Sequence, residues 1–254
     1  MSARPRVGLF VTCLVDLIRP QVGFASVKLL EDAGCEVSVP RAQTCCGQPA
    51  WNAGADRHAS EIARQVVDAF EGFDYVVAPS GSCAGMIKRH YHEVLKDDVA
   101  YATRARALAA KTHELMSFLV NGRGMKSVTA SCAARACYHD SCSSLREMKV
   151  REEPRRLLAS VGGLTIAELR DPEVCCGFGG LFSVKYPEIS ERMADDKIAD
   201  ATAAGADTLI GGDLGCLLHL AGRMERKGKR MRVRHAAEVL AGMGGGLGLG
   251  EAEK

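Results

Sequence analysis

Apolar positions follow two patterns along the first half of the chain. Short apolar runs at residues 7–13, 36–40 and 74–79 have the length and composition of buried β-strands. Residues 22–34 and 56–70 instead carry apolar side chains every three or four positions, as one face of an α-helix does. The pattern is helical again from about residue 84 to 95. A further helix is expected from Thr112, as its N-cap, to about residue 122.

The second half repeats this order. Residues 134–142, 164–169 and 208–216 are expected to be strands, and residues 154–161, 189–204, 217–227 and 235–243 are expected to be helices. Strands that alternate with helices at this spacing are typical of parallel sheets joined by crossover helices. We therefore predict an α/β protein of two similar halves related by duplication, each a small parallel sheet flanked by helices.

Glycine-rich and polar segments suggest where these halves begin and end. We expect a first cysteine-rich (C-C-G) domain at residues 1–124 and a second at residues 125–243. The glycine-rich residues 244–254 are expected to form a flexible tail.

Composition excludes several classes of function. The 254 residues are 47% hydrophobic and 25% charged, which is ordinary for a soluble globular protein. A net charge of +2 and an aromatic content of 5% give no argument for nucleic-acid binding. Neither a long apolar span nor a signal-peptide pattern is present, so we expect a cytoplasmic protein. There is also no dinucleotide-binding or Walker A motif.

The cysteines carry the candidate chemistry. Eleven is an odd and high number for a cytosolic chain, in which clustered cysteines more often indicate metal binding or catalysis than disulfides. The tripeptide C-C-G occurs twice, at residues 45–47 and 175–177. In the first half, 31 residues separate Cys13 from Cys45 and 36 separate Cys46 from Cys83; the second half has 32 between Cys142 and Cys175 and 39 between Cys176 and Cys216.

Each of these eight cysteines follows, or lies at the end of, an expected strand. Because the carboxyl ends of parallel strands share one edge of the sheet, four thiols can meet in each half. The two expected groups are Cys13, Cys45, Cys46 and Cys83, and Cys142, Cys175, Cys176 and Cys216. Thiolates suit zinc or an iron–sulfur cluster. Zinc knuckles usually use C-x-x-C pairs, which are absent, so adjacent cysteines favour a multi-iron cluster; redox thiols without metal and plain buried pairs are the alternatives.

Other residues have both a structural and a functional interpretation. His113 and His235 occupy equivalent places at the start of each half's expected last helix, where they would cap the helix or hydrogen-bond cluster sulfurs. Trp51 and Phe178 follow the two C-C-G stretches and would pack in the core or shield a cluster from water. The basic residues 223–234 form a solvated face or a docking surface for an acidic partner. Cys35, Cys132 and Cys137 have no assigned role.

The full cysteine pattern resembles the C-C-G cysteine-rich domain family, whose motif runs C, C-C-G and C-x-x-C with thirty-odd residues between the parts. Its members include the cysteine-rich subunit of heterodisulfide reductase and the iron–sulfur subunits of glycolate oxidase and anaerobic glycerol-3-phosphate dehydrogenase. The segments GQPAWNAG and CCGFGGLFSVKYPEIS are similar to those of the lactate-utilization subgroup. The resemblance covers about residues 6–242.

This resemblance implies an iron–sulfur electron-transfer subunit of a multi-protein L-lactate oxidation system, that is, a redox subunit of an L-lactate dehydrogenase complex. Its implied cofactor is one or two iron–sulfur clusters held by the eight cysteines. Its implied partners are a ferredoxin-like iron–sulfur subunit and a third subunit.

The chain departs from the family motif at the last cysteine of C-x-x-C. Met86 and His219 occupy this position in the two halves. His219 would be either a substitute ligand or, as is commoner for a helical histidine near a core, a structural residue. Four cysteines per half favour an ordinary 4Fe–4S cluster and electron transfer. The alternatives are a thiol–disulfide (heterodisulfide) reductase-like enzyme, an iron–sulfur subunit for glycolate or glycerol-3-phosphate oxidation, and a zinc-stabilised interaction module.

Overall fold

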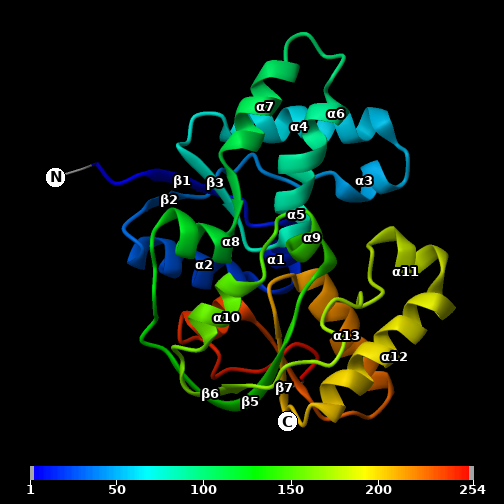
Figure 1. The fold of residues 1–254 in the computed structure, drawn as a ribbon. Helices are drawn as coiled ribbons and strands as arrows, with labels where there is room; N and C mark the ends of the chain where they lie inside the picture. The colour runs from blue at the N-terminus through cyan, green and yellow to red at the C-terminus, as the bar shows by residue number, and fades with distance from the viewer. Residues whose placement is uncertain (1–2, 252–254) are drawn as a thin grey trace.

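Two parallel four-stranded sheets form the centre of the computed structural model, which describes residues 3–251 (Figure 1). The first sheet has the order β2-β1-β3-β4, with β1 (Arg6–Leu9), β2 (Glu36–Ser38), β3 (Tyr75–Ala78) and β4 (Thr112–Glu114). The second has the order β6-β5-β7-β8, with β5 (Ser131–His139), β6 (Gly162–Ile166), β7 (Thr208–Gly211) and β8 (Arg232–His235). The two orders are equivalent, which confirms the predicted fold of two similar α/β halves.

Helices connect the strands and cover the sheets. Those of the first half are α1 (Cys13–Ile18), α2 (Pro20–Asp32), α3 (Gln48–Asn52), α4 (Asp56–Phe70), α5 (Gly81–Gly85), η1 (Met86–His90), α6 (Tyr91–Val94), α7 (Ala102–Ala110), α8 (Leu115–Ser117) and η2 (Phe118–Gly122). Those of the second half are α9 (Cys142–Arg146), α10 (Glu152–Leu158), α11 (Leu181–Lys185), α12 (Pro187–Ala203), α13 (Leu214–Arg226) and α14 (Ala236–Leu240). Among them, α4 begins and ends at the predicted residues.

Three predicted strands end earlier than the sequence pattern indicates. The chain leaves the sheet at Leu9, His139 and Gly211, and the cysteines that follow lie on helices α1, α9 and α13. Side-chain caps explain two of these early helix starts, because the hydroxyl oxygens of Thr12 and Ser141 accept hydrogen bonds from amides of the first turn.

The helix predicted to begin at Thr112 is wrong at its start. Residues Thr112–Glu114 form strand β4, which pairs with β3, and the helix begins at Leu115. Likewise, His235 ends strand β8 before α14 begins. Pairing with an existing strand overrides local helical preference here, and the mostly polar sequences THE and RVRH contain no apolar run that would indicate a strand.

The two halves share a continuous hydrophobic core. Leu9 and Leu115 of the first half belong to the same buried cluster as Tyr138 and Leu217 of the second. A separate cluster that includes Phe10 and Phe70 lies within the first half. The halves therefore pack together through an apolar interior and not through a polar surface alone.

Helices make much of the contact between the halves, and four of the helix pairs form two matched sets. Helix α5 contacts α9 while α13 contacts α1, and α2 contacts α14 while α10 contacts α8. Exchanging the halves converts one member of each set into the other, so the boundary has approximate twofold symmetry. Figure 1 shows α1, α5 and α9 between the sheets, at the carboxyl ends of the strands they follow.

The described part of the glycine-rich tail packs against the second half and reaches the first. Leu249 is buried, and its amide donates a hydrogen bond of 2.9 Å to the carbonyl oxygen of Val233. The Arg19 guanidinium donates to the carbonyl oxygen of Leu247 over 2.7 Å. Across residues 3–251, no helix is long and apolar enough to cross a membrane.

Candidate metal centre

The first group of four cysteines lies at the carboxyl edge of the first sheet. Cys13 begins α1 directly after β1, Cys83 lies in α5 after β3, and the pair Cys45–Cys46 lies in the loop between β2 and α3. The Cys45 sulfur lies close enough to the thiols of Cys13 and Cys46 for these to lower its pKa, and Cys83 in turn raises the pKa of Cys46. The structure thus brings the four predicted residues together.

The second half repeats this arrangement. Cys142 begins α9, Cys216 lies in the first turn of α13, and the pair Cys175–Cys176 precedes α11. The sulfurs of Cys142 and Cys175 are 3.9 Å apart. The sulfurs of Cys176 and Cys216 lie within 4.8 Å of each other, and Cys175 and Cys216 both raise the pKa of Cys176, so the order of contacts is the same as in the first half.

The glycine of each C-C-G shapes the loop around the first cysteine. Gly47 and Gly177 have φ angles of 83° and 89°, a left-handed conformation that favours glycine. Their amides donate hydrogen bonds of 3.4 Å to the sulfurs of Cys45 and Cys175. N–H donors of this kind stabilise a thiolate or the negative charge of a metal–sulfur centre.

Neighbouring thiols shift one another's pKa values in opposite directions. The contact with Cys13 lowers the pKa of Cys45 to about 2 and raises the pKa of Cys13. In the second half, the contact with Cys142 lowers the pKa of Cys175 to about 2 and raises that of Cys142. A soft metal deprotonates the thiols that bind it, so four sulfurs around one point fit a metal or iron–sulfur centre.

A histidine that the sequence analysis passed over joins the second group. The side chain of His139, the last residue of β5, is buried, and neither ring nitrogen has a hydrogen-bond partner within residues 3–251. A ring nitrogen and the sulfurs of Cys176 and Cys216 all lie within 4.8 Å of one another. Burial lowers the pKa of His139 to about 4, so the imidazole is neutral near neutral pH.

The predicted equivalence of His113 and His235 is wrong by one residue. Strand β8 pairs His235 with Gly211, and β4 correspondingly pairs Glu114 with Ala78. His235 does cap its helix, because its Nδ1 accepts a hydrogen bond of 3.2 Å from the Ala237 amide. Glu114 performs this role in the first half, where its carboxylate accepts from the Ser117 amide over 2.9 Å.

His113 and His219 have neighbours outside the cysteine groups. The ring of His113 packs against those of Tyr75 and Phe118, which also contact each other. The Nε2 atom of His219 is 3.2 Å from the Ser190 hydroxyl, and its ring lies 6.0 Å from that of Phe178. The His219 nitrogen is therefore engaged by a hydroxyl.

A cavity of about 300 Å³ lies between the halves, and two cysteines of the second group line it. From the first half it is lined by Gln48, Trp51, Asn52, Ser82 and His90, and from the second by Ser141, Cys142, Ser143, Glu147, Phe178, Gly179, Gly180, Asp213 and Cys216. Trp51 is half-buried, with its ring 6.1 Å from that of His90. Both predicted shielding residues, Trp51 and Phe178, thus line this space.

Residues of the second half also position the loop that carries Cys83. The buried Asp213 carboxylate accepts hydrogen bonds of 3.0 Å from the Ser80 hydroxyl and from the Ser82 amide. The Nε2 atom of His235 lies 3.2 Å from the carbonyl oxygen of Pro79. The position of Cys83 therefore depends on both halves.

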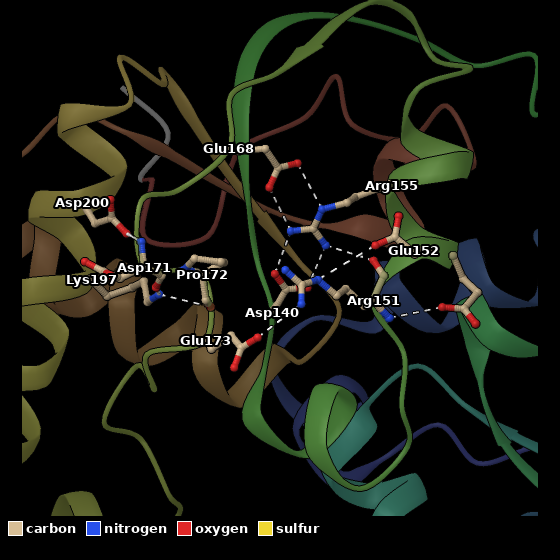
Figure 2. A network of polar contacts seen from close by, with 11 residues as sticks. Asp140, Arg151, Glu152, Arg155, Glu168, Asp171, Pro172, Glu173, Lys197 and Asp200 are labelled. Atoms are coloured by element: carbon tan, nitrogen blue, oxygen red, sulfur yellow. Dashed lines mark hydrogen bonds and ion pairs between the residues drawn. The ribbon is translucent and has the colours of Figure 1, made fainter.

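A polar network holds the two segments that deliver Cys142 and Cys175 (Figure 2). The Arg155 guanidinium donates to both carboxylate oxygens of buried Asp140, over 2.9 and 2.8 Å, and also bonds Glu168. The Lys197 ammonium donates to the Asp171 carbonyl oxygen over 2.7 Å. Asp200 accepts from the amide of Asp171, so the segment before the second C-C-G is tied to α12.

The remaining cysteines and the basic segment lie outside these groups. Cys35 and Cys137 are buried in the shared core, and burial raises the pKa of Cys137 to about 12. Cys132 is half-buried on β5. Within the basic residues 223–234, Arg223 pairs with Glu191 and Asp195, and Arg232 pairs with Asp207. Acidic groups of the same chain thus neutralise part of this surface.

Comparisons with known proteins agree with this architecture. Residues 7–88 and 136–221 match the family of the cysteine-rich domain CCG. Lactate utilization protein A of Geobacillus kaustophilus (strain HTA426) is 51% identical over 235 residues, which cover 92% of this chain and 98% of the relative. The protein of the same name from Bacillus subtilis (strain 168) is 47% identical over 92% of this chain and 98% of its own length.

A solved structure shares the fold. A hypothetical protein from Helicobacter pylori superposes with a TM-score of 0.67 at 11% identity, and the match covers 96% of this chain and 50% of that chain. The family match in both halves coincides with the two cysteine groups, and the relatives match over nearly their whole length. The chain therefore belongs to the CCG cysteine-rich domain family, together with the lactate utilization protein A sequences.

Proposed function

We propose that this protein is an iron–sulfur electron-transfer subunit of a multi-protein L-lactate oxidation system. The observation that carries the proposal is the repeated group of four converging thiols, found in a chain whose relatives are named for lactate utilization. Soft sulfur donors that are buried or half-buried at the edge of a rigid sheet suit a centre that exchanges electrons without rearranging its surroundings.

Each half would hold one ordinary 4Fe–4S cluster. The ligands in the first half would be Cys13, Cys45, Cys46 and Cys83, and those in the second half Cys142, Cys175, Cys176 and Cys216. A cluster supplies one-electron transfer when it is bound. The chain supplies the sulfur ligands, the amide donors of Gly47 and Gly177, and an interior that limits access of water.

The subunit would work with partners in the cytoplasm. A ferredoxin-like iron–sulfur subunit and a third subunit would complete the system and connect lactate oxidation to an electron acceptor. The lettered name of the relatives, lactate utilization protein A, suits one component of a set.

Anaerobic purification followed by iron and sulfide analysis and electron paramagnetic resonance tests the cofactor. We expect about four irons and four sulfides per site, and a signal that appears on reduction. Cys46→Ser and Cys176→Ser should each remove about half of the iron, whereas the matched change Cys132→Ser should leave the iron content unchanged. Stoichiometric zinc without sulfide would contradict the proposal and favour a zinc-stabilised interaction module.

Genetics tests the pathway. Deleting the gene should abolish growth on L-lactate as the carbon source, and the intact gene should restore it. A gene carrying both Cys46→Ser and Cys176→Ser should fail to restore growth, although the protein accumulates. Unimpaired growth of the deletion strain would rule out the lactate assignment.

The cavity between the halves supports a second candidate, a thiol–disulfide reductase-like enzyme. Cys142 and Cys216 both line this space, so a small disulfide placed there would meet thiol or cluster sulfur. Purified protein reduced with a low-potential dye should then oxidise the dye when disulfides are added. No dye oxidation above that of a Cys142→Ser, Cys216→Ser variant would exclude this candidate.

A further inference from the structure

The two cysteine groups are built to one plan but have different surroundings. Leu9 pairs with Val77 on β3, and Tyr138 pairs with Ile210 on β7. The next residues, Phe10 and His139, therefore occupy equivalent positions. Each also precedes the first cysteine of its group by three residues. An aromatic hydrocarbon in one half thus corresponds to an imidazole in the other.

The two sites also differ at a second position, on the helix that packs against the C-C-G loop. A Cβ atom on Gly47 would face Ile62 and Ala59 of α4, and one on Gly177 would face Met193 and Ser190 of α12. This matches Ala59 with Ser190.

Seven residues further along each helix, Val66 of α4 then corresponds to Lys197 of α12. Both side chains are buried.

In the first half, both of these positions hold apolar side chains. Phe10 and Val66 are fully buried in the same hydrophobic cluster as Cys46, and Phe10 packs on Phe70 with ring centroids 5.5 Å apart. Neither side chain offers a hydrogen bond to a sulfur. These two side chains thus offer nothing that offsets negative charge on a metal–sulfur centre.

Around the second group the environment is polar and charged. The buried Asp213 carboxylate acts electrostatically on Cys142 and Cys216. His139 directs a ring nitrogen at Cys176 and Cys216, and both of its ring nitrogens lack another partner within residues 3–251. The buried Lys197 ammonium acts electrostatically on Cys176 and on His139, while two backbone carbonyl groups accept its hydrogen bonds. An unpartnered buried nitrogen is costly unless something binds it. A cluster in this site is a suitable partner.

We propose that His139 provides an imidazole nitrogen to the centre of the second half, and that this centre has the higher reduction potential of the two. The nitrogen would bind an iron in place of one thiolate, or donate its N–H to a cluster sulfur. Either contact reduces the negative charge on the cluster, which favours the reduced state. The inference rests on the proposed function, because it requires a cluster in each half. Electrons would then move from the first half to the second.

Labelling the histidines with ¹⁵N tests the contact in the wild-type protein. Pulsed electron paramagnetic resonance of the reduced, iron-loaded protein should show a ¹⁵N coupling on one of two centres. A large coupling would identify a ligand, and a small one a hydrogen bond. The coupling should disappear in His139→Phe, which introduces the residue type found at the equivalent position of the first half. It should persist in His113→Phe, which makes the same change at a histidine packed against two aromatic rings. No coupling in the wild-type protein would overturn the inference without the need for any variant.

Redox titration of the two signals tests the order of potentials. In the wild-type protein, the centre that carries the ¹⁵N coupling should be reduced first. His139→Phe should weaken the preference of the electron for that centre by about tenfold, or about 59 mV for a one-electron couple. Lys197→Met should act in the same direction. Unchanged potentials in His139→Phe would refute the assigned role of His139, and reduction of the other centre first would refute the order.

The iron analysis separates this inference from the proposed function. Protein without iron and sulfide contradicts both. Protein with about four irons per site but without a histidine coupling contradicts the role of His139 alone.

Discussion

The conformation of a single glycine determines how closely the backbone approaches each cysteine group. Gly47 and Gly177 both adopt positive φ so that their amides reach the preceding sulfur, yet their surroundings differ. A Cβ atom on Gly47 would lie 3.3 Å from the Ile62 side chain, which can move. On Gly177 it would lie 2.5 Å from the Ser190 carbonyl oxygen, which belongs to helix α12. The second C-C-G loop is therefore the more tightly constrained.

Replacing these glycines with alanine should have unequal effects. Each change forces an L-residue into the left-handed region, at a cost of about 1–2 kcal/mol. Gly177→Ala must also displace α12, so we expect a larger loss of stability in chemical denaturation and loss of iron from the second half. Gly47→Ala is its matched control and should retain the iron of both halves. Equal losses for the two variants would contradict this argument.

At the scale of elements, α10 positions the strand end that delivers His139 and Cys142. Its Arg155 forms a two-pronged ion pair with Asp140, whose side chain is only 2% exposed. Removing one member of such a pair leaves a buried charge without compensation. Neighbouring Arg151, about half exposed, pairs with Glu152 and Glu173 at the surface, where ion pairs contribute little.

We expect Arg155→Met to lower the free energy of unfolding by about 3–5 kcal/mol. Urea denaturation of the iron-loaded protein measures this loss. Arg151→Met, the matched surface change, should cost at most about 1 kcal/mol. Equal stability of the two variants would contradict this prediction, because it would mean that another group compensates the buried Asp140 carboxylate.

Sequence patterns predicted the long and strongly periodic elements better than the short ones. The apolar spacing of α4 defined both of its ends. Strands β4 (THE) and β8 (RVRH) were missed because they are short and mostly polar, without the apolar run that marked β1 and β3. Cysteine spacing predicted which thiols meet, since the carboxyl ends of parallel strands share an edge. His139 was missed because a buried strand histidine has no distinctive local pattern. Aligning it with Phe10 across the two halves is the signal that would have found it.

At the scale of the whole molecule, buried polar groups lie where the two halves meet. The carboxylate of Glu114, which caps α8, is fully buried, and burial raises its pKa to about 7 from an ordinary value of 4.5. Between these two values the folded protein holds a proton that the unfolded chain has released. The contribution of Glu114 to stability therefore falls as pH rises through this window.

Glu114→Gln should remove this dependence, because the amide oxygen still accepts from Ser117 but carries no charge. Relative to the wild type, the variant should gain about 1–3 kcal/mol of unfolding free energy between pH 4.5 and 7, with no further gain above that range. Urea denaturation across this pH range measures the difference. A constant difference at all pH values would show that Glu114 does not titrate in this way.

The shared core predicts how the two halves behave when they are separated. A chain divided within the connecting residues 125–130 should give two fragments that are insoluble or unfolded alone, because each exposes part of one continuous core. Co-expressed fragments should associate into a 1:1 complex that binds iron, as size-exclusion chromatography and iron analysis would show. Two fragments that each fold alone and bind iron would instead indicate independent domains.

The approximate twofold symmetry of the boundary bears on how a direction of electron transfer can arise between the two halves. A dimer of identical subunits with this interface would hold two identical centres, and every change near one would appear near the other. Joining the two copies in one chain lets each diverge alone, so that Phe10 and Val66 can stand opposite His139 and Lys197. If each half holds a cluster as proposed, gene fusion would turn a symmetric pair of redox sites into an ordered one, with a distinct entrance and exit for electrons.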